Sequence, residues 1–186
     1  MPSGRTHDRI TIYSIFPMAI GVAIATQSVV QVLLFSGGFL FSGWMFGPDL
    51  DIYSLPYKRW GPLRWIWIPY QRAMAHRSML SHGPIVGTAI RLLYLSTWLL
   101  GFTALSIICW TQLQTPQHWK SLSLMQLEWL LHQVYHQLKL YPIETLVILL
   151  GLELGAMSHA LSDWSSTAMR RWRKRRLKRI ATKRRK

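Results

Sequence analysis

The stretch "ITIYSIFPMAIGVAIATQSVVQVLLFSGGFLFSGWMFGP", residues 10–48, decides the fold because its 39 residues carry no charge. A single α-helix of that length would reach roughly 58 Å, about twice the ~30 Å hydrocarbon core of a bilayer. Polar residues cluster in "ATQSVVQ", residues 25–31. We therefore expect the chain to reverse there, between short helices over about 12–25 and 32–46. Pro17 would then lie in the first turn or two, where its missing N–H is tolerated.

Two later runs are also long enough to cross a membrane. Residues 92–110 carry no charge, and residues 143–161 carry only Glu144 and Glu153. At ~1.5 Å per residue, each run can span a hydrocarbon layer. The sequence thus predicts an all-α membrane helix bundle with about four transmembrane helices, namely the N-terminal hairpin and two later spans. A buried hairpin in a soluble helical protein is the alternative interpretation of the first run.

The length of 186 residues suits one domain, followed by a basic tail. We assign residues 1–169 to a single membrane-embedded helical domain. Residues 170–186, "RRWRKRRLKRIATKRRK", hold 12 of the 22 lysines and arginines. Because this tail follows a membrane-length helix directly, we expect anionic lipid headgroups as its partner, with nucleic acid the weaker alternative.

Charge placement predicts the orientation of the bundle. With four crossings, both termini and the 48–91 connection share one side, which would carry 20 of the 22 basic residues. Only Lys120 and Lys139 would lie opposite. Basic residues accumulate on the cytoplasmic side of membrane proteins, so we expect both termini to be cytoplasmic. No short apolar stretch ends in a cleavage-like site, so no secretory signal is expected.

The same fold-back gathers histidines and aspartates at one face of the bundle. The residues brought together are His7, Asp8, Asp49, Asp51, His76, His82, His159 and Asp163. His159 and Asp163 are spaced i, i+4, which places both on one stripe of a helix. Asp49 and Asp51 are two apart, so they would point the same way only in an extended segment. Each residue also has an ordinary explanation, such as a cap or an interfacial histidine, but the gathering favours a metal site.

Mixed imidazole and carboxylate ligands suit zinc, manganese, iron or magnesium. The single Cys109 rules out a disulfide within the chain and a cysteine-based zinc site. Glu153 is an ionisable residue inside an apolar span, where such groups are costly and usually functional, so it is a candidate additional ligand or partner of a ligand. Arg77, beside His76, and Arg72 are candidates for holding an anionic substrate, although Arg72 better fits membrane anchoring.

Two segments fit the membrane surface. The segment "KRWGPLRWIWIPYQR", residues 58–72, combines aromatic and basic residues, which is typical of a stretch at the headgroup level. Packing of its rings on the helices is the alternative. His132 and His136 are spaced i, i+4 within a helix-like stretch, residues 121–139, and we interpret them as the polar face of an interfacial helix.

Four short segments carry a resemblance to a known family. They are "HDRI" (7–10), "GPDLDIYS" (47–54), "HRSMLSHGP" (76–84) and "SHALSDW" (158–164). With them the chain resembles a family of uncharacterised metal-binding membrane proteins common in cyanobacteria, and more distantly the membrane-bound metal-dependent hydrolases related to zinc-dependent phospholipase C. The resemblance covers most of the chain apart from residues 111–140 and the tail.

The resemblance implies a set of metal ligands. In the distant relatives an Asp-containing turn, a His-Arg-x-x-x-x-His loop and a late Ser-His-x-x-x-Asp helix are the metal-binding positions. These correspond here to Asp49, Asp51, His76, His82, His159 and Asp163, with His7 as an N-terminal addition. Asp8, Arg77 and Glu153 are candidates for supporting or substrate-binding roles. The chain lacks the full histidine complement of the phospholipases, so we expect one or two metals rather than three.

Two functions follow from these patterns. The first is a membrane-bound metal-dependent hydrolase of phosphoester or lipid-like substrates, with its site at the cytoplasmic face. Zinc is the metal expected first, with manganese, iron and magnesium as alternatives, and the resemblance places the protein in a bacterial inner membrane, plasma or thylakoid. The second is a non-catalytic metal-binding membrane protein whose tail binds anionic lipid or a partner.

Overall fold

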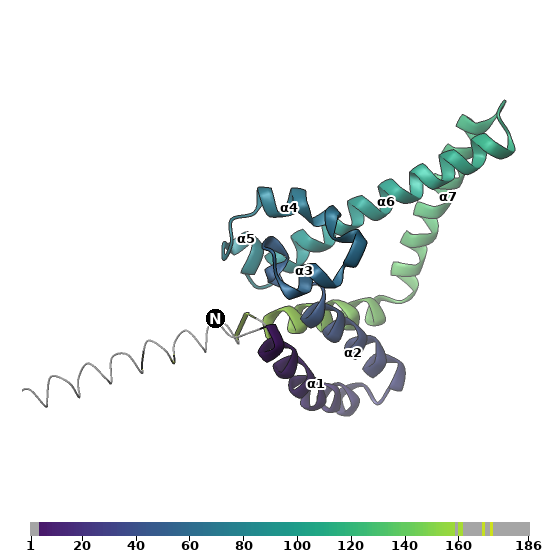
Figure 1. Ribbon diagram of the computed structural model, residues 1–186. Helices are drawn as coiled ribbons and strands as arrows, with labels where there is room; N and C mark the ends of the chain where they lie inside the picture. Colours follow the sequence, from purple (N-terminus) through teal and green to yellow (C-terminus); the bar gives the residue numbers. More distant parts are fainter. Residues whose placement is uncertain (1–3, 159, 162–168, 170–171, 173–186) are drawn as a thin grey trace, which may run out of the picture.

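The computed structural model describes residues 4–158, 160–161, 169 and 172, and all regular structure in this part of the chain is helical (Figure 1). The elements, in chain order, are α1 (Gly4–Thr26), α2 (Val29–Trp44), the 3-10 helix η1 (Pro48–Asp51), α3 (Leu55–Arg59), the 3-10 helix η2 (Gly61–Trp67), α4 (Ile68–Ala73), α5 (Met79–His82), α6 (Val86–Gln114), α7 (Trp119–Leu140) and an unlabelled helix, Pro142–Ser158.

The chain reverses where the polar cluster predicted. The break between α1 and α2 lies at Gln27 and Ser28, and Gln27 adopts φ 51°. The Ser28 hydroxyl accepts the Gln31 N–H at 3.4 Å and so caps α2. The two helices form an antiparallel hairpin (Figure 1).

Helix α1 begins earlier than expected, at Gly4 rather than near residue 12. Pro17 is therefore in the interior of the helix and not in its first turns, which corrects the sequence interpretation. A proline in this place removes the N–H that would bond to the Tyr13 carbonyl. The longer helix also carries His7 and Asp8 on its first turns.

The 48–91 connection is not a loop but a compact set of short helices above the hairpin (Figure 1). Its core consists of Phe46, Leu50, Tyr57, Ile66, Trp67, Tyr70 and Leu152, and we call this cluster the aromatic core. Trp67 is fully buried, and its ring packs edge-on against Phe46 at 5.9 Å between centroids. This core fixes η1 and α4 relative to α6. The Gln71 amide adds hydrogen bonds to the carbonyl groups of Leu50 (3.1 Å) and Ile52 (3.0 Å).

Glycines bring the 142–158 helix close to α2. A Cβ at Gly151 would lie 2.4 Å from the Phe35 carbonyl oxygen, and one at Gly155 would lie 2.3 Å from that of Phe39. Only glycine permits this approach, as is common where helices pack inside membranes. The contact places the C-terminal part of the 142–158 helix beside the C-terminal part of α2. The 3-10 helix η1 follows α2 shortly afterwards in the chain.

Three helical segments are long and apolar enough to cross a membrane: His7–Thr26, Val29–Asp51 and Val86–Gln114. Together α7 and the 142–158 helix form a further candidate, bent by 90°. The chain is thus all-helical in its described part, as the sequence predicted. It has three candidate spans, or four if the bent pair is one span, whereas the sequence predicted about four with residues 143–161 as a span by itself. The tail, residues 170–186, lies outside the described residues except for Trp172, and the division into domain and tail stays a prediction.

We expect Gly155→Ala to lower stability because the new methyl group meets a backbone carbonyl that cannot move aside. Overpacking of this kind costs about 1–3 kcal/mol. Gly21 lies in α1, and a Cβ added there would have nothing within 4 Å. Gly21→Ala should therefore leave the melting temperature unchanged or raise it, since alanine is the better helix former. Thermal unfolding in detergent measures both, and equal effects would contradict the close packing.

Candidate metal centre

A tight turn after the α1–α2 hairpin carries the two acidic side chains of the centre. In η1, Pro48 begins the turn, and Leu50 is fully buried in the aromatic core. The Asp49 carbonyl accepts hydrogen bonds from the Ser54 hydroxyl (2.7 Å) and the Ile52 N–H (3.3 Å). Asp49 and Asp51 are only 9% and 4% exposed. The turn thus places two carboxylates in the interior.

The two histidines enter from the segment between α4 and α6. His76 follows α4, and Arg77 directly after it adopts φ 62°, which turns the chain into α5. Ser78 caps α5 by accepting the Ser81 N–H at 3.2 Å. His82 is the last residue of α5, so its ring faces that of His76, with 5.2 Å between the centroids.

Asp51 contacts both imidazole rings on the Nδ1 side. Its Oδ1 lies 3.0 Å from His76 Nδ1, and its Oδ2 lies 3.6 Å from His82 Nδ1. The Ser81 hydroxyl is also 2.9 Å from His82 Nδ1. These neighbours favour the proton on Nδ1 of each ring and leave the Nε2 lone pairs for another partner. A carboxylate behind a histidine in this way is the usual support of a metal-binding imidazole.

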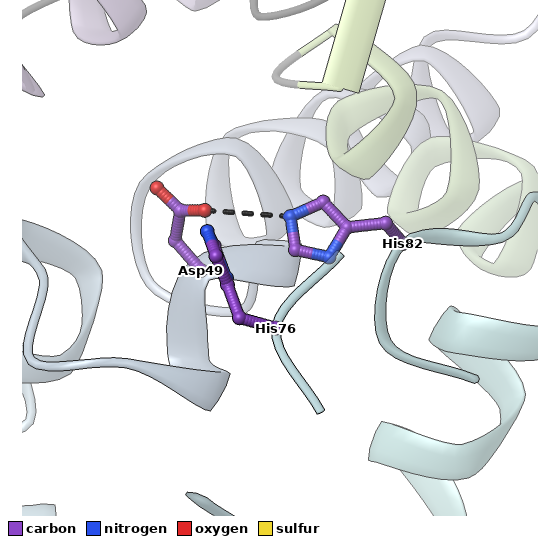
Figure 2. Close-up of side chains that lie close together, drawn as sticks. All are labelled: Asp49, His76 and His82. Atoms are coloured by element: carbon purple, nitrogen blue, oxygen red, sulfur yellow. Dashed lines mark ion pairs between the residues drawn. The ribbon is translucent and has the colours of Figure 1, made fainter. Parts of the chain in front are cut away.

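Asp49 lies on the other side of the His82 ring. Its Oδ1 is 3.5 Å from His82 Nε2 (Figure 2). A carboxylate oxygen and an imidazole lone pair both accept hydrogen bonds, so they attract only through a proton or a cation between them. Two ligand atoms that each lie ~2.0–2.2 Å from one tetrahedral ion are about 3.3–3.6 Å apart. The observed separation fits one shared metal ion.

Three residues offer ligand atoms that converge. One ligand atom each from Asp49, His76 and His82 all lie within 4.8 Å of one another (Figure 2). In the described part of the chain, His82 Nε2 is buried and makes no hydrogen bond. The donor set and this polar atom both fit a divalent cation bound by a carboxylate and two imidazoles.

The sequence indicated that Asp49 and Asp51 would point the same way only in an extended segment. The segment is a 3-10 turn, which places the carboxylates on opposite sides of the His82 ring. Asp51 is consequently not among the three converging residues. The structure places it behind the histidines, where it orients their rings.

His7 and Asp8 lie at the start of α1. His7 is buried, and the Thr11 hydroxyl one turn later donates to its carbonyl at 3.1 Å. Asp8 forms two hydrogen bonds with the Arg59 guanidinium, at 2.9 and 2.5 Å. This ion pair ties α1 to α3, so Asp8 has a partner in the fold that the sequence did not reveal.

The remaining predicted residues are placed as follows. Arg77 is exposed, next to His76. Glu153 lies in the 142–158 helix and accepts the Ile85 N–H at 2.8 Å. His159 and Asp163 lie outside the described residues. His132 and His136 are on α7, exposed and not part of the converging group.

Sequence reasoning missed Arg91 and Ser81. Arg91 is 1% exposed, and its guanidinium donates to the Ser81 carbonyl (2.7 Å) and the Thr88 hydroxyl (3.1 Å). These bonds tie α6 to the helix that carries His82. Burial raises the pKa of the nearby Tyr70 phenol, and the Arg91 cation offsets part of that rise. A cation shortly after the start of an otherwise uncharged helix, with Thr88 one turn earlier, was the available signal.

A cavity of about 180 Å³ adjoins the centre. The side chains of His82, Arg91 and Glu153 line it, and apolar residues of the 142–158 helix, including Ala156 and Met157, form another wall. Because a predicted ligand is part of its lining, the cavity gives space for a small molecule or part of a larger one beside the centre.

The chain belongs to a family of uncharacterized metal-binding proteins (DUF2227), which it matches over residues 2–173. The match includes residues 111–140, which the resemblance had left out. Metal binding is thus confirmed at the level of the family, whereas the cyanobacterial distribution and the relationship to hydrolases stay predictions.

One relative adds a partial match. A protein of Aquifex aeolicus (strain VF5), called "Uncharacterized protein", is 37% identical over 62 residues, which is 33% of this chain and 43% of the relative. The match spans less than half of the relative's length. No solved structure shows significant similarity to the chain.

We expect variants of the centre to lose metal in a graded way. His82→Ala removes a ligand and should abolish stoichiometric binding, whereas Asp51→Asn disturbs only the support of the rings and should weaken affinity roughly 10–100-fold. Elemental analysis and chelator competition in detergent measure both. His132→Ala changes an exposed histidine on α7 and serves as the control. Equal metal content in His82→Ala and wild type would exclude this centre.

Proposed function

We propose that the protein is a membrane-bound metal-dependent hydrolase of phosphoester or lipid-like substrates. The observation that carries this proposal is the convergence of three ligands, Asp49, His76 and His82, beside a cavity. Catalytic zinc sites keep three protein ligands and an open position for water or substrate, whereas structural sites are closed by four. Among the residues that the structure describes, a three-ligand set next to free space is consistent with the catalytic class.

The chemistry rests on one or two divalent ions, with zinc expected first. A bound ion of this kind lowers the pKa of a water molecule to about 7 and so supplies hydroxide at neutral pH. The residues of the chain provide the surroundings. Asp51 and Ser81 hold the His82 ring in one orientation.

Positive side chains near the centre suit an anionic substrate. Arg91 lines the cavity and is buried, so its charge is little screened by water. Arg77 is exposed beside His76 and can approach a substrate from outside. The apolar wall of Ala156, Met157 and Leu161 suits the alkyl part of a lipid-like molecule.

The exposed apolar helices support a location in a membrane. In the apolar 18-residue stretch of the α6 candidate span no residue is buried inside the molecule, and in that of the α1 span only 6% are. Such large apolar surfaces are unfavourable in water and favourable in lipid. We place both termini in the cytoplasm of a bacterial cell, in the plasma or thylakoid membrane, with the basic tail on anionic headgroups.

The short helices η2 and α4 suit the membrane surface. Their apolar residues Leu63, Trp65 and Ile68 are 54%, 46% and 38% exposed, in the segment that the sequence assigned to the headgroup level. Trp67 from the same segment is fully buried in the aromatic core. One face of the segment thus packs on the protein, and the other can contact lipid near the centre.

A specific observation favours the second candidate, a non-catalytic metal-binding membrane protein. Asp49, Asp51 and Ser81 are all buried, and they connect the α1–α2 hairpin to α5. A buried ion at such a junction stabilises a fold without any reaction.

We expect the metal-loaded protein to hydrolyse a chromogenic phosphodiester or a fluorescent phospholipid in micelles. Asp49→Asn keeps the size of the side chain but loses its charge, and it should lower kcat by about 100-fold or more, the scale of removing one group that stabilises charge in the transition state. The control is His136→Ala on α7. If wild type is inactive on both probes and Asp49→Asn lowers only the melting temperature and metal content, the non-catalytic function holds.

Cysteine labelling tests the orientation. In a Cys109→Ser background, Tyr53→Cys places a thiol at an exposed position after η1, and Gln117→Cys places one in the exposed turn between α6 and α7. We expect a membrane-impermeant reagent added to intact cells to label Gln117→Cys but not Tyr53→Cys. Labelling of both or of neither from outside would contradict the proposed topology.

A further inference from the structure

Ile85, which directly precedes α6, has an unfavourable backbone conformation. It adopts φ 63° and ψ −55°, a region that β-branched residues rarely occupy. Its side chain is 73% exposed, so burial of that side chain does not hold the conformation. A strained residue of this kind persists only where its surroundings fix the backbone.

Two contacts hold this backbone. One is local, because the Val86 N–H donates to the Pro84 carbonyl at 2.6 Å and closes a tight turn at Ile85. The other comes from a distant part of the chain. The Ile85 N–H donates to Glu153 Oε1 at 2.8 Å, and the two residues are 68 positions apart. No side chain of α6 caps its first turn, so the Glu153 carboxylate takes the place of a cap at that helix end. A negative group there is also favoured by the helix dipole.

The strained residue is closely linked to His82. Only Gly83 and Pro84 separate the two, and Gly83 packs so tightly that a Cβ would lie 2.2 Å from the Met79 carbonyl oxygen. A Cβ on Gly87 would lie 2.7 Å from the Ser81 carbonyl oxygen. The segment therefore has little room to absorb a shift at Ile85 without moving His82.

We propose that Glu153 is a positioning residue for the metal centre, which holds the His82 ring in place through the Ile85 N–H and not by binding the ion. This inference rests on the proposed role of His82 as a ligand. It gives a function to the acidic residue that stands inside an apolar run, where an ionisable group is costly. It also makes the 142–158 helix part of the metal site without supplying a ligand from Glu153.

Two other roles of Glu153 make different demands. As a ligand, or as the charge partner of Arg91 in the shared cavity, Glu153 would act through its negative charge. As the support of Ile85, Glu153 acts through a side chain long enough to place an acceptor oxygen within hydrogen-bond distance of the Ile85 N–H. Glu153→Gln keeps the reach and an acceptor oxygen but removes the charge. Glu153→Asp keeps the charge but is one methylene shorter.

The experiment measures zinc affinity of the detergent-purified full chain by chelator competition. We expect Glu153→Gln to bind zinc within about 3-fold of wild type and Glu153→Asp to bind roughly 10–100-fold more weakly, the usual effect of losing an outer-shell support. The matched controls are Glu144→Gln and Glu144→Asp, on the same helix, which should leave affinity unchanged. A loss in Glu153→Gln with retention in Glu153→Asp would overturn the proposal, as would wild-type affinity in both.

A second substitution separates positioning from general stability. Glycine adopts positive φ without strain, so Ile85→Gly removes the need for the support. We expect Ile85→Gly to restore most of the zinc affinity lost in Glu153→Asp, and an unrestored affinity would contradict the linkage. If Glu153→Asp does not fold, Glu153→Gln alone decides, because a charge-based role requires a loss there. If wild type itself binds no zinc, the metal centre fails rather than the role of Glu153.

Discussion

Two buried carboxylates on either side of one imidazole are the constraint on which the centre depends. Asp49 and Asp51 approach His82 from its Nε2 and Nδ1 sides and are almost inaccessible to water. Burying a charge is costly unless a partner compensates it. A proton on His82 Nδ1 satisfies Asp51, but the Nε2 side then presents two acceptors to each other. A cation bound by both Asp49 and His82 would replace this repulsion with two attractive contacts. Metal binding would therefore compensate the cost of burying the acidic side chains.

The sequence predicted much of the fold because hydrophobic length and charge are local properties. An uncharged run of 39 residues must fold back, and the polar residues around Gln27 and Ser28 marked the place. The extent of α1 was harder, because Arg5, Asp8 and Arg9 before the apolar run conceal a helix that continues through them. The short helices of the 48–91 connection were not predicted, since its many prolines and aromatic residues show no helical period. Its order comes from tertiary packing of Trp67 and its neighbours, which no local pattern records.

The sequence singled out the three residues that converge in the described part of the chain, within a larger predicted ligand set, but not the contacts that surround them. Asp49, His76 and His82 stood out because acids are rare in this chain and the fold-back gathers them. Asp49 and Asp51 point to different sides of the His82 ring because they lie in a 3-10 turn. The spacing of the two residues in the sequence does not reveal this turn. The Ser81 hydroxyl contacts His82, and the Arg91 guanidinium donates to the Ser81 carbonyl. Single hydrogen bonds of this kind cannot be recognised from a sequence pattern. Glu153 drew attention as a costly acid, yet its hydrogen bond to Ile85 depends on a turn 68 residues away.

The arrangement of ligands also couples the metal to the assembly of the helices. Asp49 comes from the end of the α1–α2 hairpin, His76 and His82 come from the segment before α6, and Glu153 reaches that segment from the 142–158 helix. In the proposed membrane, the long apolar helices are well accommodated by lipid, so apolar burial alone would drive their association weakly. Close approach at Gly151 and Gly155 joins the 142–158 helix to α2, and the aromatic core packs α6 against Phe46 and Leu152. An ion bound by residues from both sides therefore adds directional bonds to this non-directional apolar packing.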